Sequence, residues 1–498
     1  MRTSAEALRG HRVLVLNWRD GRHPLAGGAE QYVHEIAARW VQAGADVTLY
    51  TARGTGQAPR DRIDGIHVVR AGGPLSVYSR TAVRLLRTRG HFDAVVDCQN
   101  GVPFYAPLFV GRETPVIQVV HHVHQDQFAT RFPRPMAALG RMLEGPVARR
   151  VYEDRGIAAV SPSTRAELRR QLGFSGPIYI VPNGTQVVPA ATGERAAAPK
   201  IVVVSRLVPH KRVDLLLSHL PTVAAQVPGL RVDIVGDGPE RSWLQGLVAD
   251  LGLRGTVRFH GRVSEEVRDD LMSRAWLTTS TSAAEGWGCT IIEAASWGVP
   301  CLALRVPGVR DSVLDGETGW LVDRPSDLGG ALVDAIDHLR DQSEAAGMAQ
   351  ACREWAGCLS WERSADLLAG VVVEEMRVCA ARERNRTGNR RSGRSDMAVL
   401  ATFTTPAADH VLEALRATDE VVSRGNRTSV LLSGCDEFDA SLVLDRLGVD
   451  GADIRPVDRR LFLAGPASLL GAEQDEIGLR AGDEFSEVLG DVAIDRPA

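Results

Sequence analysis

Short, almost fully apolar runs alternate with glycine-containing turns and helical patterns along most of this chain. The first run, residues 12–17, leads to Gly27-Gly28, then to an amphipathic helical pattern closed by Gly44, and then to a second run at residues 46–50. Runs of this kind are typical of strands buried on both faces, and their alternation with helices predicts a parallel sheet covered on both sides. Because a second alternation begins at Lys200, we predict an α/β fold with two doubly wound domains.

The length and composition indicate where the domains divide. A chain of 498 residues is expected to form two or three domains. The Ala-, Thr- and Pro-rich stretch 187–199 is typical of an interdomain linker, and 385–396 is a polar, basic one. The predicted parts are an N-terminal domain (1–190), a second α/β domain (199–360), a helix (361–385), a basic linker (386–396) and a small α/β extension (397–498).

Charge and cysteine usage narrow the class of protein. The formal net charge is -4, but residues 397–498 alone carry -10, so residues 1–396 carry +6. The seven cysteines show no metal-binding spacing, and no apolar run approaches the roughly 20 residues of a membrane span. The first residues also lack the apolar core of a signal peptide. We therefore expect a cytoplasmic protein with no structural metal and no nucleic-acid partner.

Gly27 and Gly28 stand between the first strand and the first helix. Without a Cβ, their backbone can approach a phosphate group at the start of the helix. The same residues are equally compatible with a simple tight turn. The sequence therefore makes this loop a candidate phosphate contact.

Three histidines end the strand predicted at residues 116–121. His121, His122 and His124 fall where the carboxyl end of a parallel strand borders the ligand crevice, so one of the first two is placed to touch a substrate. A metal site is the alternative interpretation. Adjacent strand residues point to opposite faces and no acidic ligand lies nearby, which argues against a metal.

The second domain places two cations after an apolar strand. Arg206 follows the strand that begins at Lys200, and Lys211 lies at the start of the next helix. Together they could neutralise a diphosphate without a metal ion, the Arg through two parallel hydrogen bonds and the Lys as a point charge. The next strand is predicted at residues 231–235 and leads to Gly236, which lies in another turn before a helix.

Two carboxylates, Glu285 and Glu293, enclose a glycine-rich turn and a helix start. Glu285 is predicted on the loop, and Glu293 in the first turns of a helix that ends at Gly298. Both can face one crevice, where carboxylates accept hydrogen bonds from sugar hydroxyls and free N–H groups bind an anion.

Residues 128–155 interleave arginines with large apolar side chains. This pattern fits an amphipathic basic surface that contacts an anionic membrane surface or acceptor. It also fits a solvated helix whose apolar face packs on the core. Both interpretations remain open at this stage.

Residues 11 to about 385 resemble the family-4 retaining glycosyltransferases, which have the two-domain GT-B fold. The resemblance rests on seven motifs in order: Gly27-Gly28-Ala29-Glu30, the histidine-ended strand, Val181-Pro-Asn-Gly184, Ser205-Arg206-Leu with Lys211-Arg-Val-Asp214, Gly236-Asp-Gly-Pro-Glu240, Gly261, and Glu285-x7-Glu293. Trp287 and Cys289-Thr290 depart from the residues that are frequent in the family. The resemblance implies two Rossmann-like domains facing a cleft, with residues 361–385 crossing back to the N-terminal domain.

The resemblance also implies an activity and a role for each motif. A hexosyl group would pass from a nucleotide-diphosphate sugar to a hydroxyl acceptor on a polysaccharide, a lipid-linked glycan or a natural product. Its configuration would be retained, with neither cofactor nor metal and with no protein nucleophile. The implied catalytic residues are Arg206, Lys211, Glu285 and His121, and the implied donor-binding residues are Gly27, Gly28, Gly236, Gly286, Trp287, Gly288, Cys289, Thr290 and Glu293.

Two other functions are compatible with the same fold. A sugar phosphorylase would place free phosphate in the diphosphate pocket, and a non-catalytic protein would only bind a sugar nucleotide. In the extension we predict strands at 397–403, 429–433 and 460–464 and helices at 407–416 and 440–447, without a catalytic constellation. Asp436, Glu437 and Asp439 are a candidate cation site, or an acidic loop in solvent. Donor base, acceptor and oligomeric state leave no signature in the sequence.

Overall fold

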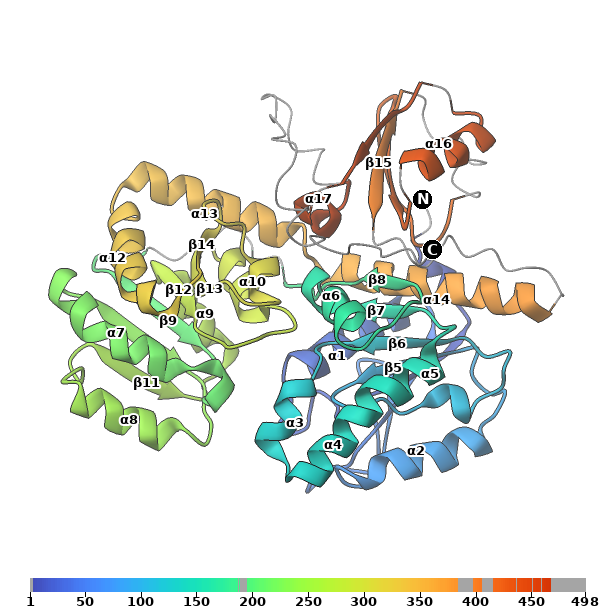
Figure 1. Cartoon of the computed structure of the whole chain (residues 1–498), viewed down its shortest axis with the longest axis horizontal. Helices are drawn as coiled ribbons and strands as arrows, with labels where there is room; N and C mark the ends of the chain where they lie inside the picture. The colour runs from blue at the N-terminus through green and yellow to red at the C-terminus, as the bar shows by residue number, and fades with distance from the viewer. Residues whose placement is uncertain are drawn as a thin grey trace, which may run out of the picture. The chain divides into compact units, whose positions relative to one another are not determined.

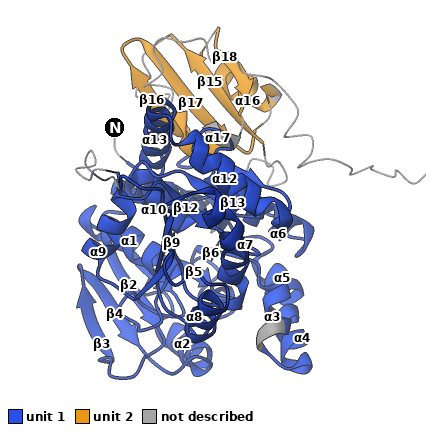
Figure 2. Cartoon of the chain, turned by 90° about the vertical axis from the view of Figure 1, so that its left-hand side faces the viewer, with its two compact units in different colours: residues 1–396, 416–418 blue, residues 397–415, 419–498 orange. Residues whose placement is uncertain are grey.

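The computed structural model describes residues 3–186, 188, 195–383, 397–404, 415–435, 437–449, 451–457 and 459–466. Figure 2 colours its two compact units, of which the first comprises residues 1–396 and 416–418 and the second residues 397–415 and 419–498. The basic linker 386–396 and most of the helix predicted at 407–416 lie outside the described residues. None of the described helices is long and apolar enough to cross a bilayer.

The first unit begins with an eight-stranded sheet in the order β3-β4-β2-β1-β5-β6-β7-β8. All neighbouring pairs are parallel except β3 with β4. The strands are β1 (Arg12–Leu16), β2 (Asp46–Thr51), β3 (Arg60–Ile63), β4 (Ile66–Arg70), β5 (Ala94–Gln99), β6 (Val116–Val120), β7 (Ile157–Ala159) and β8 (Ile178–Ile180). Because β5 and β6 are buried along their whole length, their apolar sequences carry no alternation.

Helices connect these strands and cover the sheet (Figure 1). They are α1 (Gly28–Gln42), α2 (Ser76–Arg87), α3 (Gln125–Arg131), α4 (Arg134–Met142), α5 (Ala148–Tyr152) and α6 (Pro162–Arg170), with 3-10 turns at Glu6–Leu8 and Ala106–Leu108. The basic stretch 128–155 is thus several short helices. Pro133 separates α3 from α4, and a π-helical turn, η3 (Leu143–Val147), containing Pro146 separates α4 from α5.

The second Rossmann-like domain has a six-stranded parallel sheet in the order β11-β10-β9-β12-β13-β14. Its strands are β9 (Lys200–Val204), β10 (Arg231–Val235), β11 (Val257–Gly261), β12 (Leu277–Ser280), β13 (Cys301–Leu304) and β14 (Gly319–Val322). Its helices are α7 (Val213–Gln226), α8 (Arg241–Asp250), α9 (Glu265–Ser273), α10 (Cys289–Ser296), α11 (Val309–Ser312), α12 (Leu328–His338) and α13 (Gln342–Gly357), with 3-10 turns η4 (Pro209–Lys211) and η5 (Pro325–Asp327). The predicted α/β class with two doubly wound domains is confirmed.

Helix α14 (Trp361–Glu383) follows the second domain and packs on the first. The indole Nε1 of Trp40 in α1 donates to the carbonyl of Ala365 at 2.9 Å, and Arg39 pairs with Glu362 at 2.7 Å. The hydroxyl of Ser364 donates to the carbonyl of Pro182 at 2.8 Å. The chain therefore returns to α1 and to the loop after β8.

The second unit contains a four-stranded antiparallel sheet in the order β16-β17-β15-β18. Its elements are β15 (Ala398–Phe403), β16 (Glu420–Arg424), β17 (Arg427–Ser433), α16 (Glu437–Arg446), β18 (Asp453–Pro456) and α17 (Arg459–Ala464). Helix α16 packs with one face of the sheet in a core that includes Val399, Val430 and Leu444. The small α/β extension is thus present among the described residues.

One strand predicted in the extension is wrong. Residues 460–464 form helix α17, while β18 occupies the sheet position beside β15. The run Arg-Leu-Phe-Leu-Ala has no β-branched residue, and Leu and Ala favour helix. A five-residue apolar run cannot by itself distinguish strand from helix. Of the acidic residues proposed as a cation site, Asp436 lies outside the described residues, and Glu437 and Asp439 are in the first turn of α16.

Candidate active site

The two large sheets each have a switch point where neighbouring strands lead to helices on opposite sides. In the N-terminal sheet it lies between β1 and β5, where the side-chain amide of Asn100 donates to Asn17 Oδ1 at 2.8 Å. In the second sheet it lies between β9 and β12, which are followed by Arg206 and Glu285 respectively. Ligands of doubly wound sheets bind at these positions.

Lys211 and Glu285 form a direct ion pair. Both side chains are about four-fifths buried, and the hydroxyl of Ser282 donates a second hydrogen bond to the same carboxylate oxygen at 2.6 Å. The hydroxyl of Thr281, next to Ser282, donates to the carbonyl of Arg212, which follows Lys211, at 2.8 Å. The ammonium and the carboxylate expected to meet phosphate and sugar are therefore already in contact.

The loop after Glu285 packs tightly against the end of β6. A Cβ added at Gly286 would lie only 1.7 Å from the carbonyl oxygen of His121, and the Gly286 carbonyl accepts a hydrogen bond from Thr164 Oγ1 at 3.4 Å. Only glycine permits so close an approach. The two Rossmann-like domains thus meet at Gly286.

The histidines at this contact have distinct environments. His121 is buried, its ring lies edge-on to Tyr32 with centroids 4.9 Å apart, and burial lowers its pKa to about 4, so it is neutral at pH 7. The backbone N–H of His124 donates to the fully buried Glu144 at 2.7 Å. The ring of His122 lies edge-on to that of His124, with centroids 5.2 Å apart. Of the three histidines, His121 is the one whose backbone touches Gly286.

Cys289 lies at the first residue of α10, between the glycine loop and the loop after β8. A Cβ at Gly28 would come within 3.3 Å of its sulfur, and the amide of Asn183 donates to that sulfur at 3.2 Å. Burial, and secondarily the carboxylates of Glu293 and Glu285, raise the pKa of the thiol to about 12. Cys289 is therefore a neutral thiol that both domains contact.

The start of α1 faces the same region. The carboxylate of Glu30 caps the helix by accepting from the Gly27 N–H at 2.7 Å. Burial raises the pKa of Glu30, while the Gly27 N–H and the positive charges of Arg19 and Arg206 oppose the shift. Arg206 itself is exposed. Its cation and the α1 N-terminus form a positive environment on either side of the crevice.

Glu293 lies in the second turn of α10. Burial raises the pKa of its carboxyl to about 7, although the positive charge of Arg268 on α9 opposes the shift.

The remaining residues predicted to bind the donor lie in turns and at a helix start. Thr290 is partly exposed in the first turn of α10, and a Cβ at Gly288 would collide with Ser312 Oγ at 2.3 Å. Gly236 lies beside the turn after β9, since its Cβ would be 1.9 Å from the Ser205 carbonyl oxygen.

Comparisons with known proteins identify the family. Residues 26–188 match Glycosyltransferase Family 4, and residues 187–355 match Glycosyl transferases group 1. A GDP-mannose-dependent alpha-(1-6)-phosphatidylinositol monomannoside mannosyltransferase of Mycolicibacterium smegmatis is 30% identical over 355 residues, covering 68% of this chain and 77% of that protein. The chain belongs to the glycosyltransferase family that these two matches describe.

A further relative agrees with this assignment, and a solved structure agrees with the fold. A D-inositol 3-phosphate glycosyltransferase of Geodermatophilus obscurus is 27% identical over 412 residues, covering 72% of this glycosyltransferase and 87% of the relative. Sucrose-phosphate synthase from Thermosynechococcus elongatus has a similar fold, with a TM-score of 0.59, 21% identity and coverage of 71% and 96%. The GT-B fold and the transfer from a nucleotide-sugar donor, both predicted from the sequence, are confirmed, and the phosphorylase and the non-catalytic alternatives are not favoured.

Among the buried side-chain atoms that lack a hydrogen-bond partner within the described residues, three lie around the Gly286 and Cys289 contacts. They are Nε2 of His121, Oδ1 of Asn183 and Nε1 of Trp287. They lie on three segments joined by the Gly286 and Cys289 contacts, and an unsatisfied buried polar group costs about 1–3 kcal/mol. Asn183 is not among the site residues chosen from the sequence. Its position within the motif Val181-Pro-Asn-Gly184 was the available signal, because that motif follows a strand.

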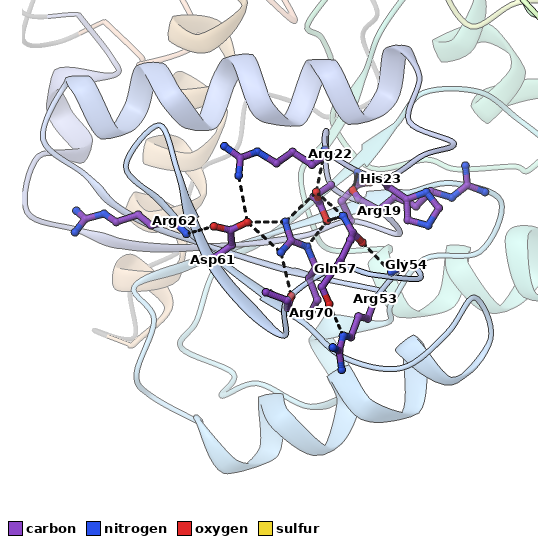
Figure 3. A network of polar contacts seen from close by, with 12 residues as sticks. Arg19, Arg22, His23, Arg53, Gly54, Gln57, Asp61, Arg62 and Arg70 are labelled. Atoms are coloured by element: carbon purple, nitrogen blue, oxygen red, sulfur yellow. Dashed lines mark hydrogen bonds and ion pairs between the residues drawn. The ribbon is translucent and has the colours of Figure 1, made fainter.

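A buried ion pair supports the loop between β1 and α1 (Figure 3). Arg70 donates to Asp20 at 2.7 and 3.2 Å, and both side chains are 1% exposed. Asp61 accepts a further contact from Arg70 at 3.3 Å, and Gln57 donates to Asp20 at 3.3 Å. In the glycosyltransferase this network joins the strand β4 to the segment that leads to Gly27.

Proposed function

We propose that this protein transfers a hexosyl group from a nucleotide-diphosphate sugar to a hydroxyl acceptor with retained configuration and without a metal ion. The observation that carries the proposal is the gathering of Lys211, Glu285, Cys289 and the start of α1 at one contact between the two domains. An ammonium, an exposed guanidinium and helix N–H groups supply the charge that a diphosphate leaving group needs.

The roles of the residues follow from this arrangement. Lys211 has three N–H donors, so it can keep Glu285 oriented while it binds the β-phosphate together with Arg206. Glu285 and the backbone of Gly286 to Gly288 hold hydroxyls of the sugar, and neutral His121 contacts it from the other domain. Glu293 accepts hydrogen bonds from the ribose.

The chemical step requires no protein nucleophile. The bond from the anomeric carbon to the β-phosphate oxygen breaks, and the acceptor oxygen bonds to the anomeric carbon from the same face. The proton of the acceptor hydroxyl passes to the departing phosphate. Positioning and charge stabilisation then supply the rate, and the loss of one preorganised donor would cost about 2.7–4 kcal/mol of transition-state stabilisation.

GDP-mannose is the first donor to test, because two of the relatives that match over most of their length are described as GDP-mannose-dependent. The acceptor proposed is a hydroxyl on an inositol-containing or otherwise lipid-linked glycan, for which the names of the same relatives are the support. This acceptor class is also consistent with a surface on the N-terminal domain.

That surface is the outward side of α4 and its flanks. Phe132, Met136, Leu139 and Met142 are each 41–50% exposed. Arg134 on the same helix is exposed, as are Arg149 and Arg150 on the following helix α5. Exposed apolar side chains together with exposed cations fit the boundary of an anionic bilayer, so we propose peripheral contact with such a membrane through this surface.

Donor screening tests the activity. We expect one nucleotide family among GDP-, UDP-, dTDP- and ADP-sugars to raise the melting temperature and to be hydrolysed slowly, with the effect lost in Lys211→Ala and Glu293→Ala. Arg258→Ala, which removes an exposed cation on β11, is the matched control and should behave as wild type. NMR of the product anomer tests retention, and activity after treatment with EDTA tests metal independence. A product of inverted configuration would refute the mechanism.

Flotation with vesicles tests the membrane contact. Wild type should float with phosphatidylcholine vesicles containing phosphatidylinositol and not with phosphatidylcholine alone. Leu139→Gln combined with Met136→Gln should abolish flotation, whereas Trp243→Gln, at a residue 54% exposed on α8, should not. Undiminished flotation of the double variant would show that another surface binds the lipid.

A further inference from the structure

A cavity of about 720 Å³ lies at the end of the second domain's sheet away from the active site. Lys200, the first residue of β9, lines it, whereas Arg206 follows the last residue of the same strand. Five residues of strand span about 16 Å, so the cavity is separate from the donor crevice. Its walls come from the segment before β9, from α9 and from the end of α10, and they include Arg195, Lys200, Glu266, Asp269, Asp270 and Trp297.

Arg195 is the unusual residue of this cavity. Its guanidinium stacks on the indole of Trp276, with Cζ 3.7 Å from the ring centroid. Its Nη2 is buried and donates to no acceptor in the described part of the chain. Burial alone lowers the pKa of Arg195 to about 10, without an opposing carboxylate. Arg195 is partly buried, and a partly desolvated cation without an anion loses stability that a bound anion would restore.

The other cations that line the cavity, and two of its carboxylates, already form ion pairs. Lys200 pairs with Asp233 at 2.9 Å, and Arg274 pairs with Asp270 at 2.8 Å. Asp269 pairs with Arg268 at 3.0 Å. Among the described lining residues, Arg195 is therefore the cation for which no ion pair is formed. An anion entering the cavity would find this guanidinium available.

The acidic side of the cavity restricts what else the ligand carries. Glu266 is exposed, and Glu266, Asp269 and Asp270 all lie on α9, where their oxygens can accept hydrogen bonds from hydroxyls. A second large anion would be repelled there. Trp297 offers an apolar surface to the same space, and such surfaces pack against the C–H groups of a sugar ring. One anionic group joined to a hydroxylated ring matches these three features.

We propose that this cavity binds a sugar monophosphate, with the phosphate on Arg195 and the hydroxyls on the carboxylates of α9. The ligand would also contact the segment that begins the second domain, since Ala196 and Ala197 line the cavity. The backbone of Ala196 is held in place because it accepts from Trp276 Nε1 at 2.7 Å and donates to the Arg274 carbonyl at 3.0 Å. On α10 it would lie one helical turn beyond Glu293, because Trp297 is at position i+4 from that residue.

Titration of the full chain with glucose 6-phosphate and mannose 6-phosphate, followed by calorimetry and melting temperature, tests the proposal. We expect saturable binding with a rise in melting temperature for at least one of the two, and none for glucose or mannose. Arg195→Gln should abolish binding, and Arg258→Gln, an exposed arginine on β11, should leave it unchanged. Glu266→Gln, at an exposed site, should weaken binding of the sugar phosphate even if Arg195→Gln fails to fold.

Lys211→Ala distinguishes this cavity from the donor crevice. The variant should keep full affinity for the sugar phosphate, because Lys211 follows the opposite end of β9. Loss of binding in Lys211→Ala with binding retained in Arg195→Gln would place the ligand in the donor crevice and overturn the proposal. Equal binding of inorganic phosphate and sugar phosphate would overturn the role of the α9 carboxylates. If neither glucose 6-phosphate nor mannose 6-phosphate binds, the whole proposal is overturned.

Discussion

Replacing Gly286 by alanine should disable the active site while leaving each domain folded. The added Cβ would lie 1.7 Å from the His121 carbonyl oxygen, whereas real Cβ contacts stay beyond 3.0 Å. The loop or the end of β6 must therefore move by about 1.3 Å, because neither atom is at the end of a flexible side chain. Glu285 and Trp287 flank this residue, so both would move with it.

A displacement of this size is large for catalysis. A misplacement of about 1 Å can cost about 100-fold in rate, so we expect kcat/KM to fall by at least about 100-fold. Overpacking should lower stability by only about 1–3 kcal/mol. The assay is transfer or hydrolysis with the donor that stabilises the wild type, combined with chemical denaturation.

Gly347→Ala is the matched control for this substitution. Gly347 lies within α13, and its added Cβ meets nothing within 4 Å. The variant should keep full activity and gain about 0.5–1 kcal/mol, because alanine is the better helix former. Gly286→Ala with activity within a few-fold of wild type would refute the reasoning, since it would mean that the loop does not depend on its contact with His121.

Three further predictions address single side chains. Trp287→Phe removes a buried N–H that lacks an acceptor among the described residues. If a ligand oxygen accepts this N–H in the complex, kcat/KM should fall by about 10-fold without loss of stability. If the indole only packs, the substitution should raise the stability and leave the kinetics unchanged. Burial raises the pKa of Glu293 to about 7, so its carboxylate is lost as the pH falls through 7. The carboxylate is the form that accepts hydrogen bonds from ribose hydroxyls, so the KM for the donor should rise below pH 7. Glu293→Gln should show a KM that does not depend on pH if Glu293 is responsible. Arg70→Met leaves Asp20 as a buried charge without its ion-pair partner and should lower the free energy of unfolding by about 3–5 kcal/mol. The double variant that also carries Asp20→Asn should recover part of this loss. A loss below about 1 kcal/mol in Arg70→Met would contradict the importance of the pair.

Local patterns were sufficient for the elements that build the site. The strand at residues 12–17, the helix after Gly28, the strand at 231–235 and the helix containing Glu293 were all predictable, because burial on both faces and helical amphipathicity leave their periods in neighbouring residues. Since parallel strands place their carboxyl ends at one edge, the residues after them could be assigned to a crevice.

Only the tertiary structure determined how those residues meet. The contact of Gly286 with His121, the bond from Asn183 to Cys289 and the Arg70–Asp20 pair all join segments far apart in the chain. Each depends on strand order and on how closely two backbones approach, and neither leaves a periodic signal in the sequence. The sequence by itself therefore determined which residues follow the strands. The packing of the strands and of the two domains decided which of those residues touch, because such contacts are set by long-range geometry and burial.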